Sequence, residues 1–170
     1  MPISLHDAVV PTLLQGLGAG HGWIDKAKAH GLSEETLASA CLIEDMLPFT
    51  YQVKSMAHHS MGAIEGLRAG VFGPDMADPP ATYAGLHAKL TEAEDFLRAL
   101  DPAELDGLAG GHMRFEFKEH KVPFTPTDFL LSFSQPNFFF HATTAYGILR
   151  AGGVPVGKRD YLGTLRTKEA

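Results

Sequence analysis

The stretch PNFFFHATTAYGILR, residues 136–150, determines how the rest of the sequence is interpreted. Its spacing predicts a helix with one face, at steps of three and four residues, made of Leu130, Phe133, Asn137, His141, Thr144 and Ile148. That face should pack against the core, so the imidazole of His141 should point inward. A buried polar group without a partner costs about 1–3 kcal/mol, so His141 needs either a hydrogen-bond partner or a metal ion.

Three other long segments show the periodicity of amphipathic helices, namely residues 4–30, 48–68 and 81–100. Ser4 should cap the first helix and Asp45 the second, because short polar side chains accept hydrogen bonds from the free amides at helix starts. The glycines in the first segment predict either the close approach of a neighbouring helix or a bend.

The fourth helix should begin at Thr127 and Asp128, continue through Pro136 and end before Gly152. Ahead of it, residues 113–117 alternate apolar and polar side chains, a pattern that is typical of a strand. Glu119 and His120 should form the turn of a small hairpin, which must rest on the helices because an isolated hairpin is marginally stable.

Together these elements predict an all-α fold, a four-helix bundle with a small β-hairpin between the third and fourth helices. The chain has 170 residues, so residues 1–170 should form a single domain. The three phenylalanines at 138–140 point in three adjacent directions of one helix, which is more than one core face can bury. One of them should therefore be exposed in a monomer, and this favours a homodimer.

The composition argues against several classes of protein. A net charge of −6 with scattered basic residues disfavours nucleic-acid binding, which needs concentrated Lys and Arg. The single cysteine, Cys41, rules out an intramolecular disulfide. The N-terminal residues lack the basic start of a secretory signal, and no apolar run approaches the length of a membrane span. We expect a cytoplasmic protein without membrane or nucleic-acid partners.

If His141 is a metal ligand, other parts of the chain must supply further metal ligands. Asn137 lies one turn before His141, so its amide should be directed to the same point, although an amide oxygen is a weak ligand. The second helix offers His59, which flanks the apolar face, and His58, which turns further toward solvent. Asp45 and Gln52 share an edge with His59 and are alternative oxygen ligands. The alternative without a metal is a neutral His141 that forms a hydrogen bond to a hydroxyl or amide in the core.

The other histidines, at positions 6, 21, 30, 87, 112 and 120, show no ligand-like grouping and are interpreted as loop or surface residues. No residue can be assigned as a general base from the sequence, and Thr144, Tyr146 and Asp45 are only candidates.

The segment PNFFFHATTAYGILRAGGVPVGKRDYLG closely resembles the C-terminal signature of a bacterial family of unknown function, numbered nineteen ninety-three among such domains. ISLHDAVVPTLLQGL, EDMLPFTYQV and TPTDFLLSF resemble its other blocks, so the resemblance spans nearly the whole chain. That family is similar to the DinB/YfiT-like metalloenzymes, and this implies a four-helix bundle that commonly dimerises.

The resemblance also implies a metal site. In the wider superfamily, one histidine of the second helix and an H-x-x-x-H pair of the fourth bind a divalent metal, usually nickel or zinc. Arg150 and Gly153 match the end of that block, which places His141 on the second histidine of the pair and Asn137 on the first. The second-helix histidine maps to His58 or His59. The pair is therefore N-x-x-x-H, which leaves a degraded ligand set.

Two functions of different classes follow. The first is a metal-dependent enzyme of transferase or hydrolase type that acts on a small molecule, with the metal held by His141, His59 or His58, and Asn137. The second is a non-catalytic module, a dimer or small-ligand-binding protein that kept the bundle without the metal.

Overall fold

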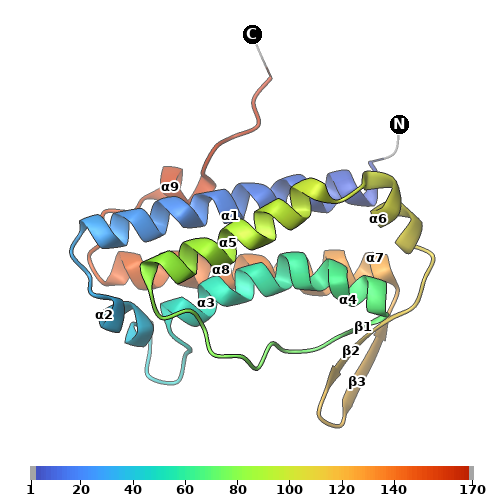
Figure 1. Cartoon of the computed structure of the whole chain (residues 1–170), viewed down its shortest axis with the longest axis horizontal. Coiled ribbons are helices and arrows are strands. Elements are labelled where there is room, and N and C mark those ends of the chain that lie inside the picture. The colour runs from blue at the N-terminus through green and yellow to red at the C-terminus, as the bar shows by residue number, and fades with distance from the viewer. Residues whose placement is uncertain (1–2, 169–170) are drawn as a thin grey trace.

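The computed structural model describes residues 3–168 and is mostly helical, with a small three-stranded sheet. Four long helical segments lie side by side along the longest axis of the molecule (Figure 1). They are α1 (Leu5–Ala29), the run of α3 (Phe49–Ala57), η1 (His58–Gly62) and α4 (Ala63–Ala69), α5 (Tyr83–Ala99), and the run of α7 (Pro126–Asp128), η2 (Phe129–Ser134) and α8 (Gln135–Ala151). Helices α1 and α3 each pack against both α5 and α8.

The helix starts largely follow the capping signals of the sequence. The side chain of Ser4 caps α1, and Thr82 and Thr125 cap α5 and α7. The prediction for Asp45 is wrong, because α3 begins after Pro48, which makes no side-chain cap, and Asp45 lies in the preceding turn. The rigid ring of proline already sets a backbone angle suited to a helix start, so α3 forms without that cap.

Two of the long helical runs contain a π-helical turn. The segments η1 and η2 each continue directly into the α-helix on either side, and both were expected to be plain α-helix. A π-turn holds more residues than an α-turn, so it rotates the following side chains relative to an unbroken α-helix. Such turns are frequent at functional sites. Here η1 contains His58 and His59.

The hairpin forms as predicted and gains a third strand. β2 (Met113–Phe117) pairs antiparallel with β3 (His120–Phe124), and Lys118 takes a positive φ of 53° in the turn. The turn thus falls at Lys118 and Glu119, while His120 already pairs with Phe117. β1 (Val71–Phe72) pairs parallel with β2, and its Phe72 ring packs against His58 and His59 of η1.

The core lies between the four long helical runs, and the glycines of α1 allow a close approach there. A Cβ atom at Gly16 would stand 2.6 Å from Cε1 of Phe138, and one at Gly20 would stand 2.9 Å from Cδ1 of Leu90. The glycines therefore let α8 and α5 pack closely on α1.

Of the three adjacent phenylalanines, Phe138 is fully buried, whereas Phe140 is 55% exposed, as the sequence predicts for a single chain.

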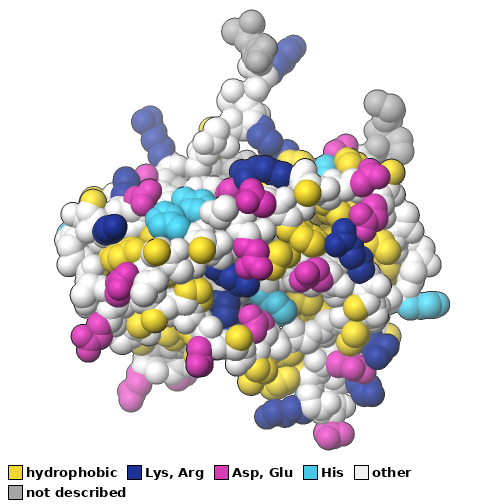
Figure 2. Space-filling view, viewed as in Figure 1, with side chains coloured by type: hydrophobic (Ala, Val, Ile, Leu, Met, Phe, Trp, Pro, Cys, Tyr) yellow, Lys and Arg dark blue, Asp and Glu magenta, His cyan; other side chains and the backbone are white. Residues whose placement is uncertain are grey.

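Shorter helices complete the fold. These are α2 (Glu34–Ser39), α6 (Pro102–Leu108) and α9 (Lys158–Leu162). Of these, α2 and α6 lie towards opposite ends of the molecule (Figure 1). α9 lies on α1 (Figure 1), where Trp23 Nε1 donates a 2.8 Å hydrogen bond to the Asp160 carbonyl and Gln15 Nε2 donates one of 2.7 Å to Leu162. Acidic and basic side chains alternate over the face shown in Figure 2. No helix within residues 3–168 is long and apolar enough to cross a membrane.

Candidate functional site

A cavity of about 210 Å³ lies between the α3–η1 helix, the loop after β1 and helix α8. It is lined by Tyr51, Lys54, Ser55, His58, His59, Phe72, Pro74, Asp75, Phe115, Phe133, Asn137 and His141. All four residues proposed from the sequence as metal ligands therefore border one cavity. The fold brings them together because α3 and α8 are packed neighbours.

His59 and His141 are close neighbours in the lining of this cavity. Their ring centroids are 5.6 Å apart, and the ring planes differ by 20°. His59 is 9% exposed and comes from η1, where the π-turn directs it toward α8. His141 comes from the middle of α8, on the face that the sequence analysis assigned to the interior.

The hydrogen-bond network fixes the tautomer of His141. Gln52 Nε2 donates a 2.7 Å hydrogen bond to the Leu47 carbonyl, and this turns Gln52 Oε1 toward His141. His141 Nδ1 lies 2.7 Å from that oxygen. Because an amide oxygen only accepts, His141 Nδ1 carries the hydrogen and donates it. The Nε2 atom of neutral His141 is therefore unprotonated.

The same reasoning applies to His59. The Ser134 hydroxyl donates a 2.9 Å hydrogen bond to the His59 carbonyl, which leaves a lone pair on Ser134 Oγ. His59 Nδ1 lies 3.3 Å from that oxygen and donates to it. The Nε2 atom of His59 is thus also a lone-pair donor. Two imidazoles held at Nδ1 with Nε2 unprotonated are the form in which histidines bind metals.

Both rings stay neutral far below physiological pH. Burial, followed by the charges of His141 and His58, lowers the pKa of His59 to about 3. Burial, followed by the charge of His58, lowers the pKa of His141 to about 4. A general base works best with a pKa near the working pH, so this pair is better suited to accept a metal or a hydrogen bond than to shuttle protons.

His58 and Asn137 line the same cavity but are already engaged. His58 Nε2 donates a 2.7 Å hydrogen bond to the Gly73 carbonyl, and its Nδ1 faces Gly62 so closely that a Cβ there would lie 2.7 Å away. Burial lowers the pKa of His58 as well. Asn137 Nδ2 donates a 2.7 Å hydrogen bond to the Phe133 carbonyl, which leaves its Oδ1 as the free end of the amide.

The donor set matches a metal only in part. Across residues 3–168, no group of three or more His, Cys, Asp or Glu side chains is placed to hold a metal ion. The residues present fit a two-histidine site, His59 with His141, completed by weak oxygen donors. They do not fit a site of three histidines.

The other candidates from the sequence lie outside the lining of the cavity. Asp45 sits in the turn before α3 and is exposed. Thr144 donates its hydroxyl to the Phe140 carbonyl one turn earlier, and Tyr146 packs edge-on against Tyr161. Gln52, considered an oxygen ligand, instead orients His141. None of these residues lines the cavity.

Sequence reasoning missed three residues of the site. Ser134 orients His59, and Lys54 and Ser55 line the cavity beside it. The one available signal was helical spacing, because Ser55 precedes His59 by four residues and Lys54 precedes His58 by four. Ser134 gave no signal, since its role depends on the way η1 and η2 face each other.

The structure also joins two histidines that the sequence analysis left ungrouped. His21 Nδ1 on α1 lies 2.6 Å from His87 Nδ1 on α5, and His87 Nε2 donates a 3.0 Å hydrogen bond to Asp25. Histidine side chains gather on the face where α1 and α5 lie (Figure 2). Burial lowers the pKa of His21. The arrangement ties α1 to α5, with one hydrogen shared between the two Nδ1 atoms.

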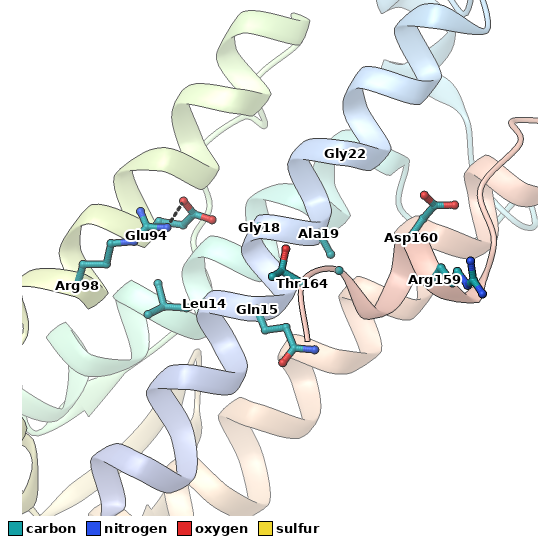
Figure 3. Close-up of a pocket in the computed structure, with 11 residues that line it drawn as sticks. Leu14, Gln15, Gly18, Ala19, Gly22, Glu94, Arg98, Arg159, Asp160 and Thr164 are labelled. Atoms are coloured by element: carbon teal, nitrogen blue, oxygen red, sulfur yellow. Dashed lines mark ion pairs between the residues drawn. The ribbon is translucent and has the colours of Figure 1, made fainter. Parts of the chain in front are cut away.

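A second, larger cavity of about 390 Å³ lies on α1 between α5 and α9 (Figure 3). Gly18 and Gly22 leave its floor without side chains, and Glu94 and Arg159 lie on opposite sides of it (Figure 3). Its charges are largely matched within the protein, since Glu94 pairs with Arg98 at 2.9 Å and Asp160 pairs with Lys26 at 2.8 Å. The histidine cavity therefore remains the stronger candidate site.

Comparisons with known proteins agree with this architecture. The family model described as "Domain of unknown function (DUF1993)" matches residues 5–162. A crystal structure of a DinB family member protein from Shewanella denitrificans superposes with a TM-score of 0.82 at 26% sequence identity. That match covers 98% of this chain and 96% of the other. No curated protein matches the sequence.

Proposed function

The chain belongs to the DUF1993 family, and on that basis we propose that it is a DinB-like four-helix bundle whose histidine cavity holds a divalent metal ion and binds a small molecule beside it. His59 and His141 would hold the ion through their Nε2 atoms. Asn137 Oδ1 would add a weak oxygen donor from the wall of the same cavity. The observation that carries the proposal is the pair of neutral imidazoles, each held at Nδ1 by its own acceptor.

The donor types narrow the identity of the metal. Imidazole nitrogen suits zinc and nickel, whereas magnesium and calcium prefer oxygen. Because the neutral rings release no proton on binding, the metal does not compete with hydrogen ions at neutral pH. Two protein nitrogens with an amide oxygen would leave open coordination positions, as in catalytic rather than structural sites.

The bound ion would supply a Lewis acid that polarises a substrate oxygen or a water. The surrounding residues of the chain then set the geometry. Gln52 holds the His141 ring in place, and Ser134 does the same for His59. Phe72 and Phe133 pack against His59 and keep water from its faces. This arrangement supports a transferase or hydrolase type of reaction on a small molecule.

Metal content tests the proposal directly. Protein purified without chelators should carry zinc or nickel, and His141→Ala and His59→Ala should each remove it, because one remaining imidazole is a poor site. Gln52→Leu should weaken binding by about 10–100-fold, since it removes the acceptor that orients His141. Metal is measured by elemental analysis and by competition with a chromophoric chelator.

The matched control for the metal experiment is His112→Ala. It removes an exposed histidine that does not line the cavity, so metal content should stay at the wild-type level. Equal, substoichiometric metal in the wild type and in His141→Ala would contradict the proposal and favour a ligand-binding module without metal.

We also propose that the chain forms a homodimer through the face around Phe140. This side chain is 55% exposed, although it lies next to buried parts of α8. Leu47 is 51% exposed, and its carbonyl is bound by Gln52, which contacts His141 beside Phe140. Large aromatic side chains are enriched in protein interfaces, so the exposed ring of Phe140 is the feature that favours association here.

Light scattering tests the dimer. Phe140→Ser should weaken association by at least ~30-fold, because burial of one interface aromatic contributes about 2 kcal/mol or more. Val122→Ser, which removes an apolar side chain of similar exposure from β3, should leave the mass unchanged. A wild-type protein that is monomeric at high micromolar concentration would reject the dimer.

A further inference from the structure

The histidine cavity contains a buried ammonium group that the metal proposal does not use. The Lys54 side chain is 4% exposed and lines the cavity. Its Nζ donates hydrogen bonds of 2.8 Å to the Asp75 carbonyl and 2.6 Å to the Ala77 carbonyl, and it lies 5.0 Å from the centre of the Tyr51 ring. These contacts use two of its three hydrogens.

The charge of Lys54 is only loosely balanced by the protein. Within residues 3–168 its ion-pair partner is Asp75, whose Oδ2 lies 3.8 Å from Nζ, beyond hydrogen-bonding distance. Asp75 Oδ1 is occupied by a 2.9 Å hydrogen bond from the Ala77 amide. A buried cation held by carbonyl dipoles and a distant carboxylate still gains from a closer anion. The third hydrogen of Nζ is available to such an anion.

A second donor borders the cavity next to Lys54. Ser55 is 4% exposed and is one of the residues that line the cavity. A hydroxyl can donate as well as accept a hydrogen bond, so Ser55 at the cavity wall can bond to a ligand beside Lys54. Tyr51 and Ser55 of α3 and His59 of η1 all line the cavity, so Ser55 lies on the same wall as His59.

From these contacts we infer that the cavity binds a small organic carboxylate, with its oxygens on Lys54 Nζ and Ser55 Oγ and its remainder directed toward His59 and His141. The reaction at that far end rests on the proposed function, whereas the carboxylate subsite itself needs no metal. A single ammonium beside Asp75 suits a monoanion better than a phosphate dianion. The cavity of about 210 Å³ is below the range of about 300–1,000 Å³ for drug-sized ligands, so the ligand is small.

The test measures the binding of benzoate to the full chain after a chelator has removed any metal. NMR titrations, monitored through amide chemical shifts, give the affinity. Benzamide, which has nearly the same shape and no charge, is the control ligand. Benzoate should bind at least ~10-fold more tightly than benzamide, because only the carboxylate gains from a buried ammonium. Inorganic phosphate at equal ionic strength should compete poorly.

Two variants should act in opposite directions. Lys54→Met keeps the apolar stem and should weaken benzoate binding at least ~10-fold, and Ser55→Ala should weaken it by roughly 2–10-fold. Asp75→Asn keeps the oxygen that accepts from Ala77 but removes the competing charge, so benzoate should bind more tightly. Benzamide binding should change little in all three.

Opposite effects of Lys54→Met and Asp75→Asn on benzoate affinity distinguish a lysine that binds the ligand from a lysine that only stabilises the fold. If Lys54 only fastens the loop at Asp75 and Ala77, both Lys54→Met and Asp75→Asn will weaken any binding alike, and that result overturns the inference. Equal affinities for benzoate and benzamide, or competition by phosphate as strong as by a carboxylate, also overturn it. If Lys54→Met does not fold, Asp75→Asn decides alone, and unchanged or weaker benzoate binding refutes the carboxylate subsite.

Discussion

Replacing Phe138 with alanine should lower the free energy of unfolding by about 3–5 kcal/mol, because the surrounding helices cannot close the space that the ring leaves. Phe138 is fully buried, and its ring rests on the bare backbone of Gly16 in α1. Phe139 packs edge-on against it at a centroid distance of 5.3 Å. Urea denaturation followed by circular dichroism measures the loss, which in a chain of this size lowers Tm by about 6–20 °C.

Phe140→Ala is the matched control, since the same substitution two residues later removes a side chain that is 55% exposed. In the monomer it should change the free energy of unfolding by less than about 0.5 kcal/mol. The effect at Phe138 should not depend on protein concentration. Any effect at Phe140 should come from association alone and should vanish on dilution. Equal losses at both positions would contradict the packing of α8.

The long helices were predictable because their apolar periodicity extends over many turns. Periodicity also assigned the inward face of α8 and with it the position of His141. The cap at Asp45 failed for a local reason, since Pro48 starts α3 without a side-chain partner. Element ends depend on a few local contacts, and these have weaker sequence signals than the repeated pattern of a whole helix.

The π-turns and the third strand could not be read from the sequence. A π-turn inserts residues into a helix without a distinctive composition, so the directions in which His58 and His59 point could not be derived from the sequence. β1 has two residues, and its pairing with β2 joins segments more than forty positions apart. Such a pairing is set by tertiary packing rather than by local preference.

The site was predictable in its histidines but not in its supporting residues. His59 and His141 meet because α3 and α8 are neighbours in the fold. Gln52 and Ser134 hold these histidines by hydrogen bonds. Those contacts depend on the axial position of the α3–η1 helix relative to the η2–α8 helix. A shift of one helical turn would exchange those partners, and the sequence contains no measure of that shift.

Acidification from pH 7 to pH 5 should lower the free energy of unfolding of the chelator-treated protein by about 2–4 kcal/mol. His59 and His141 are neutral in the folded protein, with pKa values lowered to about 3 and about 4. In the unfolded chain they take up protons below a pKa of about 6.5. Their neutral burial therefore stabilises the fold fully above pH 6.5, and the contribution falls as the pH drops toward the folded pKa values.

The size of the effect follows from the difference in bound protons. Near pH 5 the unfolded state holds about one more proton than the folded state at each of the two histidines, and each proton gives about 1.4 kcal/mol per pH unit. The pKa of His58 and that of His21 are lowered as well, so both act in the same direction. Carboxylates interfere little in this window, because a lowered pKa, such as that of Asp160, affects stability only below about pH 4.

The double variant His59→Gln/His141→Gln isolates the pair, because glutamine keeps a polar side chain but does not titrate. Its free energy of unfolding should fall between pH 7 and pH 5 by roughly half as much as that of the wild type, or less. His141→Gln alone should lie between the two. Urea midpoints at several pH values, with a chelator present throughout, provide the comparison. If the wild type and the double variant lost the same stability over this range, the two rings would have to be protonated or solvated in the folded protein, and the neutral pair on which metal binding depends would not exist.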